Sequence, residues 1–351
     1  MLPCKDVMVV TKVSREICLT EYPVGMPTNN NFKLVQVEIP EPTKDGEFLV
    51  RNIWMSVDPY MRGRMRKEGN SYIPPFKLGQ PLEGACIGQV IASKNNQFAV
   101  GDYVLGMCGW REYWLSNGLD IIKVNQKISP IQSFLGTFGM TGLTAYVGLL
   151  NIGELKDNEV VFVSAASGAV GSIVCQIAKI KGCYVIGSAG SEEKVKWLVD
   201  QAGIDYAFNY KQVGDISAEL IKVCPDKINV YFDNVGGKHL EAALDNMKTF
   251  GRIVLCGMIS QYNSTSPILG PSNLFLAITN RLKLQGFIVR DYYDILNEFY
   301  ASMAKWVSEG KIKWKETVVE GIENAPKAFL GLFQGENFGK MLVKIGSDPT
   351  V

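Results

Sequence analysis

Hydrophobic positions in the middle of the chain alternate between short continuous runs and helical spacing. Residues 160–163 are all apolar, as in a strand buried on both faces, and Val170, Ile173, Val174 and Ile177 then recur on one face of a helix. Further strands are predicted at 184–188, 205–209, 228–232, 252–256 and 283–289, with helices at 191–202 and 238–247. Strands that alternate with helices at this spacing predict a doubly wound parallel sheet of the Rossmann type.

A different pattern precedes and follows this unit. Short β-like runs separated by turns occupy the first third of the chain, at residues 32–38, 47–57, 85–92, 102–105 and 110–116. After about residue 310 the pattern predicts a strand, a helix and a last strand, at 315–319, 323–333 and 340–345. We therefore expect an α/β protein with a mostly β substrate domain at 1–133, a Rossmann-type domain at 134–310, and a C-terminal return at 311–351 that completes the first domain.

Small residues dominate the turn between the first strand of the unit and its helix, Ser164-Ala165-Ala166-Ser167-Gly168-Ala169-Val170-Gly171. A helix N-terminus reached through such a turn offers free backbone N–H groups and the positive end of the helix dipole to a phosphate. Gly168 and Gly171 carry no Cβ that would keep a pyrophosphate or the neighbouring strand at a distance. The pattern predicts a dinucleotide site at the carboxyl end of this strand.

The end of the second strand indicates which dinucleotide is bound. NAD sites usually place Asp or Glu there, whereas this chain has Ser188-Ala189-Gly190-Ser191, with no acid. Lys194 follows in the next helix, and Tyr210 follows the third strand. Because a missing carboxylate removes repulsion and a lysine adds attraction for a 2′-phosphate, NADPH is favoured over NADH. Two neighbouring glutamates temper this preference, and Lys194 could instead be an ordinary exposed helix lysine.

Composition excludes several classes of partner. The 351 residues carry a formal net charge of +1 without a basic block, which argues against nucleic acid and anionic membranes. No apolar run approaches the roughly 18 residues needed to cross a bilayer, and residues 1–6 lack the pattern of a signal peptide. The eight cysteines are scattered without a CxxC pair, which is typical of reduced thiols in a cytoplasmic protein.

The chain has few of the histidine and paired cysteine residues that bind zinc. The chain contains one histidine, His239, which is predicted to be a polar helix residue rather than a catalyst. One histidine and widely spaced cysteines supply neither a catalytic zinc triad nor a four-cysteine structural site. The same count argues against a Ser-His-Asp or Cys-His hydrolase. We expect a reaction that needs no metal and no histidine proton relay.

Several motifs follow one another in a fixed order along nearly the whole chain. They are Val57-Asp58-Pro59-Tyr60-Met61-Arg62-Gly63-Arg64-Met65, Gly139-Met140-Thr141-Gly142-Leu143-Thr144-Ala145-Tyr146, residues 165–171, Phe232-Asp233-Asn234-Val235-Gly236-Gly237, residues 256–263 and Asn337-Phe338-Gly339-Lys340. On these motifs the chain resembles the zinc-independent medium-chain dehydrogenase/reductases. More narrowly, it resembles the NADPH-dependent alkenal/one double-bond reductases, which include prostaglandin, 2-alkenal and curcumin reductases. Zinc-bearing relatives have a cysteine and a Gly-His-Glu where this chain has residues 57–60 and 81–84.

The resemblance implies a GroES-like substrate domain, a homodimer, and hydride transfer from NADPH to the β-carbon of an α,β-unsaturated ketone or aldehyde. The protein then has to hold the reacting carbons together and stabilise the enolate. Tyr262 is predicted to be the catalytic hydroxyl donor and also a cofactor contact, because a phenol keeps its proton at neutral pH and can donate it. A quinone reductase of the same superfamily and a catalytically silent NADPH-binding protein are the alternatives.

The resemblance also implies the remaining site residues. The expected cofactor contacts are Ala166, Gly168, Ala169, Val170 and Gly171 at the pyrophosphate, Lys194 and Tyr210 at the 2′-phosphate, Asn234 at the nicotinamide, and Cys256, Gly257, Met258, Phe287, Ile288, Val289 and Asn337 around the rest. Tyr60, Tyr72 and Met140 are expected to line the substrate cleft, where aromatic walls suit a planar conjugated substrate.

Overall fold

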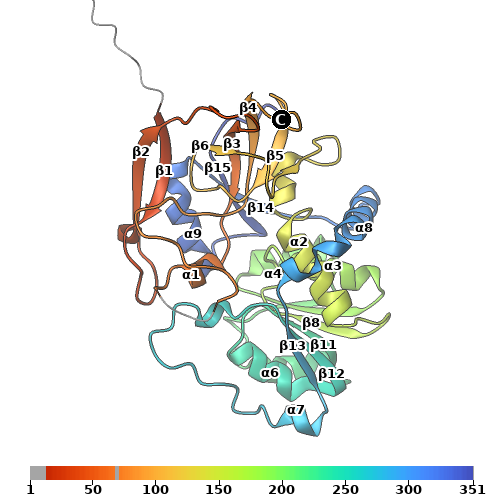
Figure 1. The fold of residues 1–351 in the computed structure, drawn as a ribbon. Helices are drawn as coiled ribbons and strands as arrows, with labels where there is room; N and C mark the ends of the chain where they lie inside the picture. The colour runs from red at the N-terminus through yellow and green to blue at the C-terminus, as the bar shows by residue number, and fades with distance from the viewer. Residues whose placement is uncertain (1–12, 68–70, 351) are drawn as a thin grey trace, which may run out of the picture.

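The computed structural model describes residues 13–67 and 71–350. Residues 1–6, on which the expectation of no signal peptide depends, lie outside these ranges. Figure 1 shows a strand-rich upper half, mostly red to yellow, and a lower half in which helices flank a second sheet. Within the described ranges, no helix has the length and apolar character required to traverse a lipid bilayer.

Six strands form the sheet of the lower half in the order β10-β9-β8-β11-β12-β13, and every neighbouring pair is parallel. Their bounds are β8 (Val160–Val163), β9 (Tyr184–Ala189), β10 (Tyr206–Asn209), β11 (Ile228–Asp233), β12 (Met247–Leu255) and β13 (Lys283–Gly286). The chain order runs outward in both directions from β8, so the predicted doubly wound parallel sheet is confirmed. Sheets of this kind bind ligands at the carboxyl ends of the strands, beside the point where the order reverses.

The central strands of this sheet are buried on both faces. Val161 and Val163 belong to the core shared with α2 (Met140–Val147), α3 (Gly171–Ile180), α4 (Glu192–Asp200) and α8 (Leu296–Ser308). Phe162, which lies between them, packs instead in the core shared with α5 (Ile216–Val223) and α6 (Lys238–Asn246). Successive side chains of a strand point to opposite faces, so the continuous apolar run reflects a sheet covered by helices on both sides.

A seven-stranded sheet forms the upper half, in the order β14-β15-β3-β4-β5-β7, with β6 also paired to β3. Its strands are β3 (Phe48–Ser56), β4 (Cys86–Ser93), β5 (Tyr103–Gly106), β6 (Tyr113–Ser116), β7 (Ile122–Lys123), β14 (Glu316–Glu320) and β15 (Lys340–Lys344). The antiparallel pair β1 (Val13–Leu19) and β2 (Phe32–Glu38) forms a separate two-stranded sheet. The protein therefore has the expected two-domain fold, with a parallel-sheet domain and a sheet-rich domain.

The C-terminal segment packs with the sheet-rich domain. Strand β15 pairs antiparallel with β3, through Leu342 opposite Ser56. Helix α9 (Ala325–Gln334) buries Phe329 in the same core as Phe48 and Trp110. The C-terminal segment thus provides part of a core that is formed mainly by the first third of the chain.

The elements of the structure differ in places from those predicted from the sequence. The strand predicted at 283–289 ends at Gly286, and a 3-10 helix spans Val289–Ile295 after it. Phe287 and Ile288 therefore lie in a connection across the end of the sheet, because the chain turns there toward α8. Helices α5 and α8 and strand β1 were not predicted from the sequence, although Phe299 and Met303 of α8 are about one helical turn apart and both fully buried.

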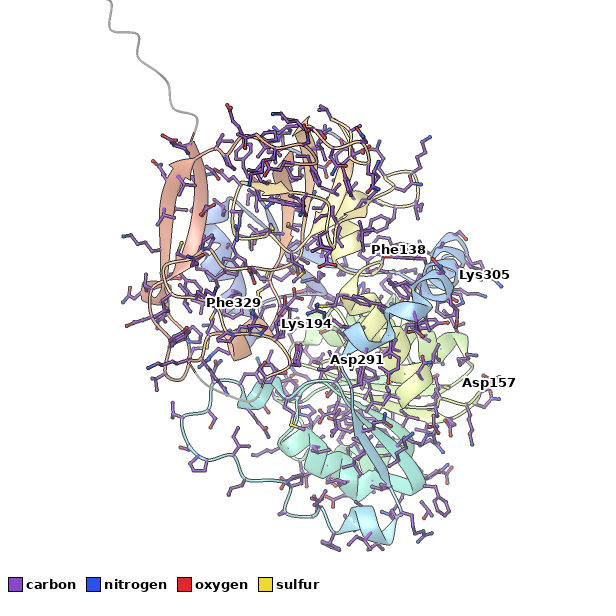
Figure 2. All side chains as sticks on the ribbon, in the orientation of Figure 1. Phe138, Asp157, Lys194, Asp291, Lys305 and Phe329 are labelled. Atoms are coloured by element: carbon purple, nitrogen blue, oxygen red, sulfur yellow. The ribbon has the colours of Figure 1, made fainter. Side chains whose placement is uncertain are left out.

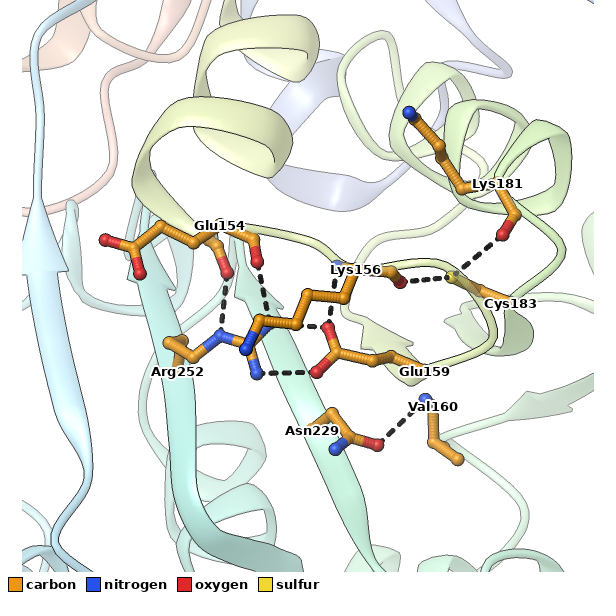
Figure 3. A network of polar contacts seen from close by, with 9 residues as sticks. Glu154, Lys156, Glu159, Val160, Lys181, Cys183, Asn229 and Arg252 are labelled. Atoms are coloured by element: carbon orange, nitrogen blue, oxygen red, sulfur yellow. Dashed lines mark hydrogen bonds and ion pairs between the residues drawn. The ribbon is translucent and has the colours of Figure 1, made fainter.

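A polar network holds the amino ends of the parallel strands together (Figure 3). Arg252 of β12 donates to both carboxylate oxygens of Glu159, which immediately precedes β8, and to the carbonyl oxygens of Gly153 and Glu154. The Asn229 side chain of β11 accepts from the amide of Val160 at 3.0 Å. This network fixes the end of the sheet opposite to the phosphate-binding turn and so supports the strands that position the site.

Candidate active site

The turn between β8 and α3 presents backbone donors at the carboxyl end of the sheet. Ala165 has a left-handed conformation, with φ +47°, and the amide of Gly168 donates to its carbonyl oxygen at 2.9 Å. Among the described residues, no acceptor lies within hydrogen-bond range of the amides of Val170 and Gly171. These two free N–H groups at the N-terminus of the ten-residue helix α3 suit a phosphate oxygen.

Other residues predicted at the pyrophosphate shape this turn. Ala166 is fully buried, and its amide donates to the carbonyl oxygen of Ser188 at 2.9 Å, so it does not offer a free donor. A Cβ on Gly171 would lie 2.3 Å from the carbonyl oxygen of Ala165, so close packing requires glycine there. Gly168 and Ala169 are half-buried at the rim of the turn. The backbone around these positions fits a dinucleotide pyrophosphate.

A basic cluster, Lys194 and Lys211, lies at the end of β9, where the sequence has no acid. Lys194 is half-buried, and its Nζ donates to the carbonyl oxygen of Gly335 at 2.6 Å. Burial, and then the nearby ammonium of Lys211, lower the pKa of Lys194. The Lys211 Nζ lies 6.0 Å from the ring centroid of Tyr210, and a Cβ on Gly190 would lie 3.4 Å from that ring. The structure thus brings Tyr210 close to Lys211 and Gly190, and Lys194 lies in the region between the two halves (Figure 2).

Lys211 was not identified from the sequence. It directly follows Tyr210, and its position beside Lys194 became visible only once β9 and β10 were paired in space. Two neighbouring ammonium groups repel each other and attract an anion. A 2′-phosphate on the adenosine ribose fits this basic cluster, whereas a free ribose hydroxyl would bring no negative charge to either lysine.

His239 packs against Tyr210, beside this basic cluster. Its ring lies edge-to-face with that of Tyr210, with 5.1 Å between the centroids. The side chain is 5 % exposed, and its Nε2 has no hydrogen-bond partner in the described part of the chain. Burial lowers the pKa of His239 to about 4, so the ring is neutral at pH 7. The histidine expected to be a polar helix residue is therefore a buried neutral support for Tyr210.

Tyr262 follows the 3-10 helix Ile259–Gln261, beyond the carboxyl end of β12. The amide of Met258 donates to its phenol oxygen at 3.2 Å, and a Cβ on Gly257 would lie 3.1 Å from that oxygen. Burial raises the pKa of Tyr262, and the neighbouring Cys256 and Asp233 raise it further. The phenol oxygen accepts from the backbone and keeps its proton, which leaves the O–H available as a donor.

A buried carboxylate organises the end of β11 beneath this tyrosine. Oδ1 of Asp233 accepts from the hydroxyl of Tyr231 at 2.7 Å and from the amides of Val235 and Gly236 at 2.9 and 2.8 Å. The side chain of Asn234 donates to the carbonyl oxygen of Ser164 at 2.8 Å. Asn234 is thus fixed between the ends of β8 and β11, and its contact with the nicotinamide stays a prediction.

The other residues predicted around the cofactor lie at three places. The amides of Cys256 and Gly257 both donate to the carbonyl oxygen of Asp233 at 3.0 Å, and burial raises the pKa of the Cys256 thiol to about 12. Phe287 packs edge-to-face on Tyr292, and Val289 is 9 % exposed, so both serve the core more than an open site. The side-chain amide of Asn337 donates to the carbonyl oxygen of Gly339 at 2.9 Å.

Of the three residues predicted to line the substrate cleft, two lie near each other and the third lies apart. Tyr60 is half-buried, and burial and the neighbouring Asp58 raise its pKa. Tyr72 is 56 % exposed, and partial burial and then the nearby Tyr262 raise its pKa. These effects indicate that phenols from both domains face one region. Met140 instead packs against the core of the parallel-sheet domain, and no described contact joins it to these tyrosines.

A metal site is not apparent in the described residues. Between residues 13–67 and 71–350, no group of three or more His, Cys, Asp or Glu side chains is arranged to hold an ion. Seven cysteines in these ranges are free thiols. The donor set here consists of backbone amides, lysines and phenols, which suit phosphates and a polarised carbonyl.

Comparison with known proteins identifies the family. Residues 15–124 match a family model described as the N-terminal domain of oxidoreductase, and residues 169–309 match one described as a zinc-binding dehydrogenase. The chain is 43 % identical over 338 residues to an NADP-dependent 2-alkenal reductase of Nicotiana tabacum, which covers 95 % of this chain and 98 % of that protein. The chain belongs to the alkenal/one double-bond reductase family of the medium-chain dehydrogenase/reductases.

Further members of this reductase family match over nearly their whole length. The NADPH-dependent curcumin reductase of Escherichia coli is 40 % identical over 340 residues, with 95 % of this chain and 98 % of that protein covered. A crystal structure of CurA from Vibrio vulnificus in complex with NADPH has a TM-score of 0.90 and 44 % identity, with 95 % and 100 % covered. The name of the second family model refers to zinc, but the metal ligands that such a name implies do not cluster in the described residues.

Proposed function

We propose that this protein reduces the C=C double bond of α,β-unsaturated ketones and aldehydes with NADPH. The observation that carries the proposal is the position of Tyr262, whose phenol oxygen accepts from the Met258 amide beyond β12, near the buried end of β11. The basic cluster at the end of β9 and the free amides at α3 support NADPH as the reductant. The named activities of the 2-alkenal and curcumin reductases support the reaction.

NADPH would be held by groups at three parts of the parallel-sheet domain. The amides of Val170 and Gly171, with the small residues Gly168 and Ala169 beside them, would bind the pyrophosphate. Lys194, Lys211 and Tyr210 would bind the 2′-phosphate. Asn234, Cys256, Gly257, Met258, Asn337 and the backbone of residues 287–289 would surround the rest of the cofactor.

When bound, the nicotinamide supplies a hydride to the β-carbon of the substrate. The chain contributes electrostatic stabilisation, because negative charge then accumulates on the substrate carbonyl oxygen. The Tyr262 hydroxyl donates a hydrogen bond to that oxygen. Its raised pKa means that it remains protonated at pH 7 and loses its proton only if the carbonyl oxygen becomes a strong base. The α-carbon of the enolate then takes a proton from water or through Tyr262, which completes the reduction of the C=C bond.

Aromatic residues of both domains would shape the substrate cleft. Tyr60 and Tyr72 from the sheet-rich domain would stack on a planar conjugated substrate, near Tyr262 of the other domain. Met140, which packs against the core of the parallel-sheet domain, stays a predicted substrate contact. A cleft lined by such rings excludes water from the reacting carbons. We also propose the domain division at 1–133, 134–310 and 311–351, which agrees with the pairing of β15 with β3.

Zinc independence and a cytoplasmic location belong to the same proposal. The donor set of the site supplies amides and phenols in place of a metal cluster. Seven described cysteines are free, and a reducing compartment keeps such thiols from pairing. The formal net charge is only +1, which does not favour binding to nucleic acid or to anionic membranes. A small enone or enal is therefore the proposed partner.

A homodimer is proposed through three exposed apolar side chains of the segment that leads into β13, called here the apolar face. Leu269, Phe275 and Ile278 are 86, 63 and 81 % exposed and lie between β12 and β13 in the chain. Strand β13 is the last strand of the parallel sheet, and it leaves one edge without a partner among the described strands. An apolar face beside an open sheet edge suits a second copy of this chain.

A substrate panel tests the proposed activity. Purified protein with NADPH should consume 2-nonenal and curcumin, as followed by loss of absorbance at the nicotinamide band, and should act slowly on benzoquinone. Faster turnover of benzoquinone would identify a quinone reductase instead. No turnover of any acceptor, together with tight NADPH binding, would identify a silent nucleotide-binding protein. Activity that disappears after chelation and returns with zinc would overturn the metal-free reaction.

A further inference from the structure

Arg62 is a buried guanidinium whose hydrogen-bond acceptors are all neutral. It is 3 % exposed, its Nε donates to Oδ1 of Asn263 at 2.8 Å, and its Nη2 donates to the carbonyl oxygens of Gly25 and Pro23 at 2.8 and 3.3 Å. Burial, and then Arg66, lower its pKa to about 10, so it is a cation at pH 7. A buried charge without a carboxylate partner is costly to stability.

The partners of Arg62 come from two parts of the chain that are far apart in sequence. Arg62 lies in α1 (Met61–Arg64) of the sheet-rich domain, and Asn263 lies more than two hundred residues later, in the loop beyond β12. The side-chain amide of Asn263 also donates to Sδ of Met26 at 3.0 Å. One guanidinium thus fastens the loop after β12 to α1 and to the turn at residues 23–26.

This loop carries the proposed catalytic tyrosine. Asn263 is the residue after Tyr262, and the Nη2 of Arg66 donates to the main-chain carbonyl oxygen of Tyr262 at 3.0 Å. Arg66 therefore holds the carbonyl of Tyr262, and Arg62 holds the side chain of the next residue, Asn263. On its N-terminal side the tyrosine follows only the three-residue 3-10 helix Ile259–Gln261.

We propose that Arg62 is a positioning residue, which acts through Asn263 and together with Arg66 to fix the Tyr262 hydroxyl against the substrate carbonyl. The inference depends on the proposed role of Tyr262 and adds the residues that set its position. It also makes the catalytic geometry depend on both domains, because α1 belongs to one and Tyr262 to the other. A displacement of about 1 Å at a catalytic group can lower a rate by about 100-fold.

Asn263→Ala tests this role because it removes the acceptor for Arg62 and leaves Tyr262 unchanged. We expect kcat to fall by about 10- to 100-fold, whereas the Kd for NADPH, measured by fluorescence titration, changes less than about 2-fold. Asn263→Asp keeps an acceptor for the guanidinium and should restore most of kcat. Ser264→Ala is the matched control, since its hydroxyl bonds only within the loop, to Ser266, and it should retain full activity.

Arg66→Ala provides a second variant, at an exposed arginine. It removes the donor to the Tyr262 carbonyl without disturbing a buried group, so it tests whether the arginines position Tyr262 even if Asn263→Ala unfolds. We expect a smaller fall in kcat, with the thermal midpoint unchanged. Full activity in both Asn263→Ala and Arg66→Ala would overturn the inference.

A double-mutant cycle separates this inference from the proposed function. If Asn263 acts through the Tyr262 hydroxyl, Asn263→Ala should cost almost nothing in kcat when added to Tyr262→Phe. Two additive losses would mean that Asn263 acts independently of the hydroxyl, and the inference would fail while the role of Tyr262 stands. Full activity of Tyr262→Phe alone would instead refute the role of Tyr262 in the proposed function.

Discussion

Lys340 and Asp58 form a buried ion pair, with 3.1 Å between Nζ and Oδ1 and side chains only 5 and 6 % exposed. The lysine ammonium also donates to the carbonyl oxygens of Val57 and Met341, each at 3.0 Å. This pair joins the last strand of the chain to the segment that leads into Tyr60. One residue before the lysine, the amide of Gly339 donates to the carbonyl oxygen of Ser167, in the phosphate-binding turn, at 2.9 Å. Adjacent residues of the C-terminal segment therefore contact both halves of the site.

Lys340→Met should destabilise the protein strongly. The substitution leaves the Asp58 carboxylate buried without its cation, which costs about 3–5 kcal/mol in the free energy of unfolding. Urea denaturation followed by circular dichroism measures this loss. Lys94→Met, at an exposed lysine, is the control and should change stability by less than about 0.5 kcal/mol. Equal stability of the two variants would show that the pair contributes nothing.

Tyr262→Phe should lower kcat by about 100-fold or more and leave the Kd for NADPH within about 2-fold. The reason is that the hydroxyl is used mainly when charge forms on the substrate carbonyl oxygen. Steady-state kinetics with 2-nonenal and a fluorescence titration with NADPH measure the two quantities. Tyr184→Phe, at the amino end of β9 and 40 % exposed, is the matched control. A weakened NADPH complex with unchanged kcat would assign Tyr262 to the cofactor alone.

Lys194→Ala and Lys211→Ala should each weaken NADPH by about 10- to 100-fold, the value of a charge-assisted hydrogen bond to a phosphate. NADH lacks the 2′-phosphate, so its Kd should change little in either variant. Parallel titrations with both dinucleotides make the comparison. Lys196→Ala, at an exposed lysine of the same helix, should bind both like the unaltered protein. Equal losses for NADPH and NADH would assign these lysines to another part of the cofactor.

His239 should make the protein less stable in mild acid. Burial lowers its pKa to about 4, whereas the unfolded chain has the ordinary value near 6.5. The unfolded state therefore binds the extra proton between these values, and the free energy of unfolding falls as the pH drops from about 6.5 to about 4, by up to about 3 kcal/mol. Urea titrations across this range measure the slope. His239→Gln should show a shallower slope, and an identical slope would contradict the prediction.

Ile278→Asp should convert the proposed dimer to a monomer, because it places a charge on the exposed apolar face beside β13. Size-exclusion chromatography with light scattering measures the mass of the particle. Ile221→Asp, on α5 and 60 % exposed, is the matched control and should keep the mass of the unaltered protein. A monomer before any substitution would refute the dimer directly.

The parallel-sheet domain was largely predictable from the sequence because its signals are local. The apolar run at 160–163 indicates a strand covered on both faces, and the small residues that follow indicate a tight entry into a helix. The absence of an acid after residues 184–188 is equally local, and so is the shortage of histidines. These features point to a doubly wound sheet, a dinucleotide and a site without a metal cluster.

Contacts between distant residues were decided only by the tertiary structure. Lys211 beside Lys194, Lys340 against Asp58, and Arg62 against Asn263 each join segments that no periodicity relates. Likewise, nothing in the residues 287–289 shows that the edge strand stops at Gly286. Hydrophobic spacing specifies which face of an element is buried, but the pairing of one polar side chain with another depends on where the packed elements bring their ends.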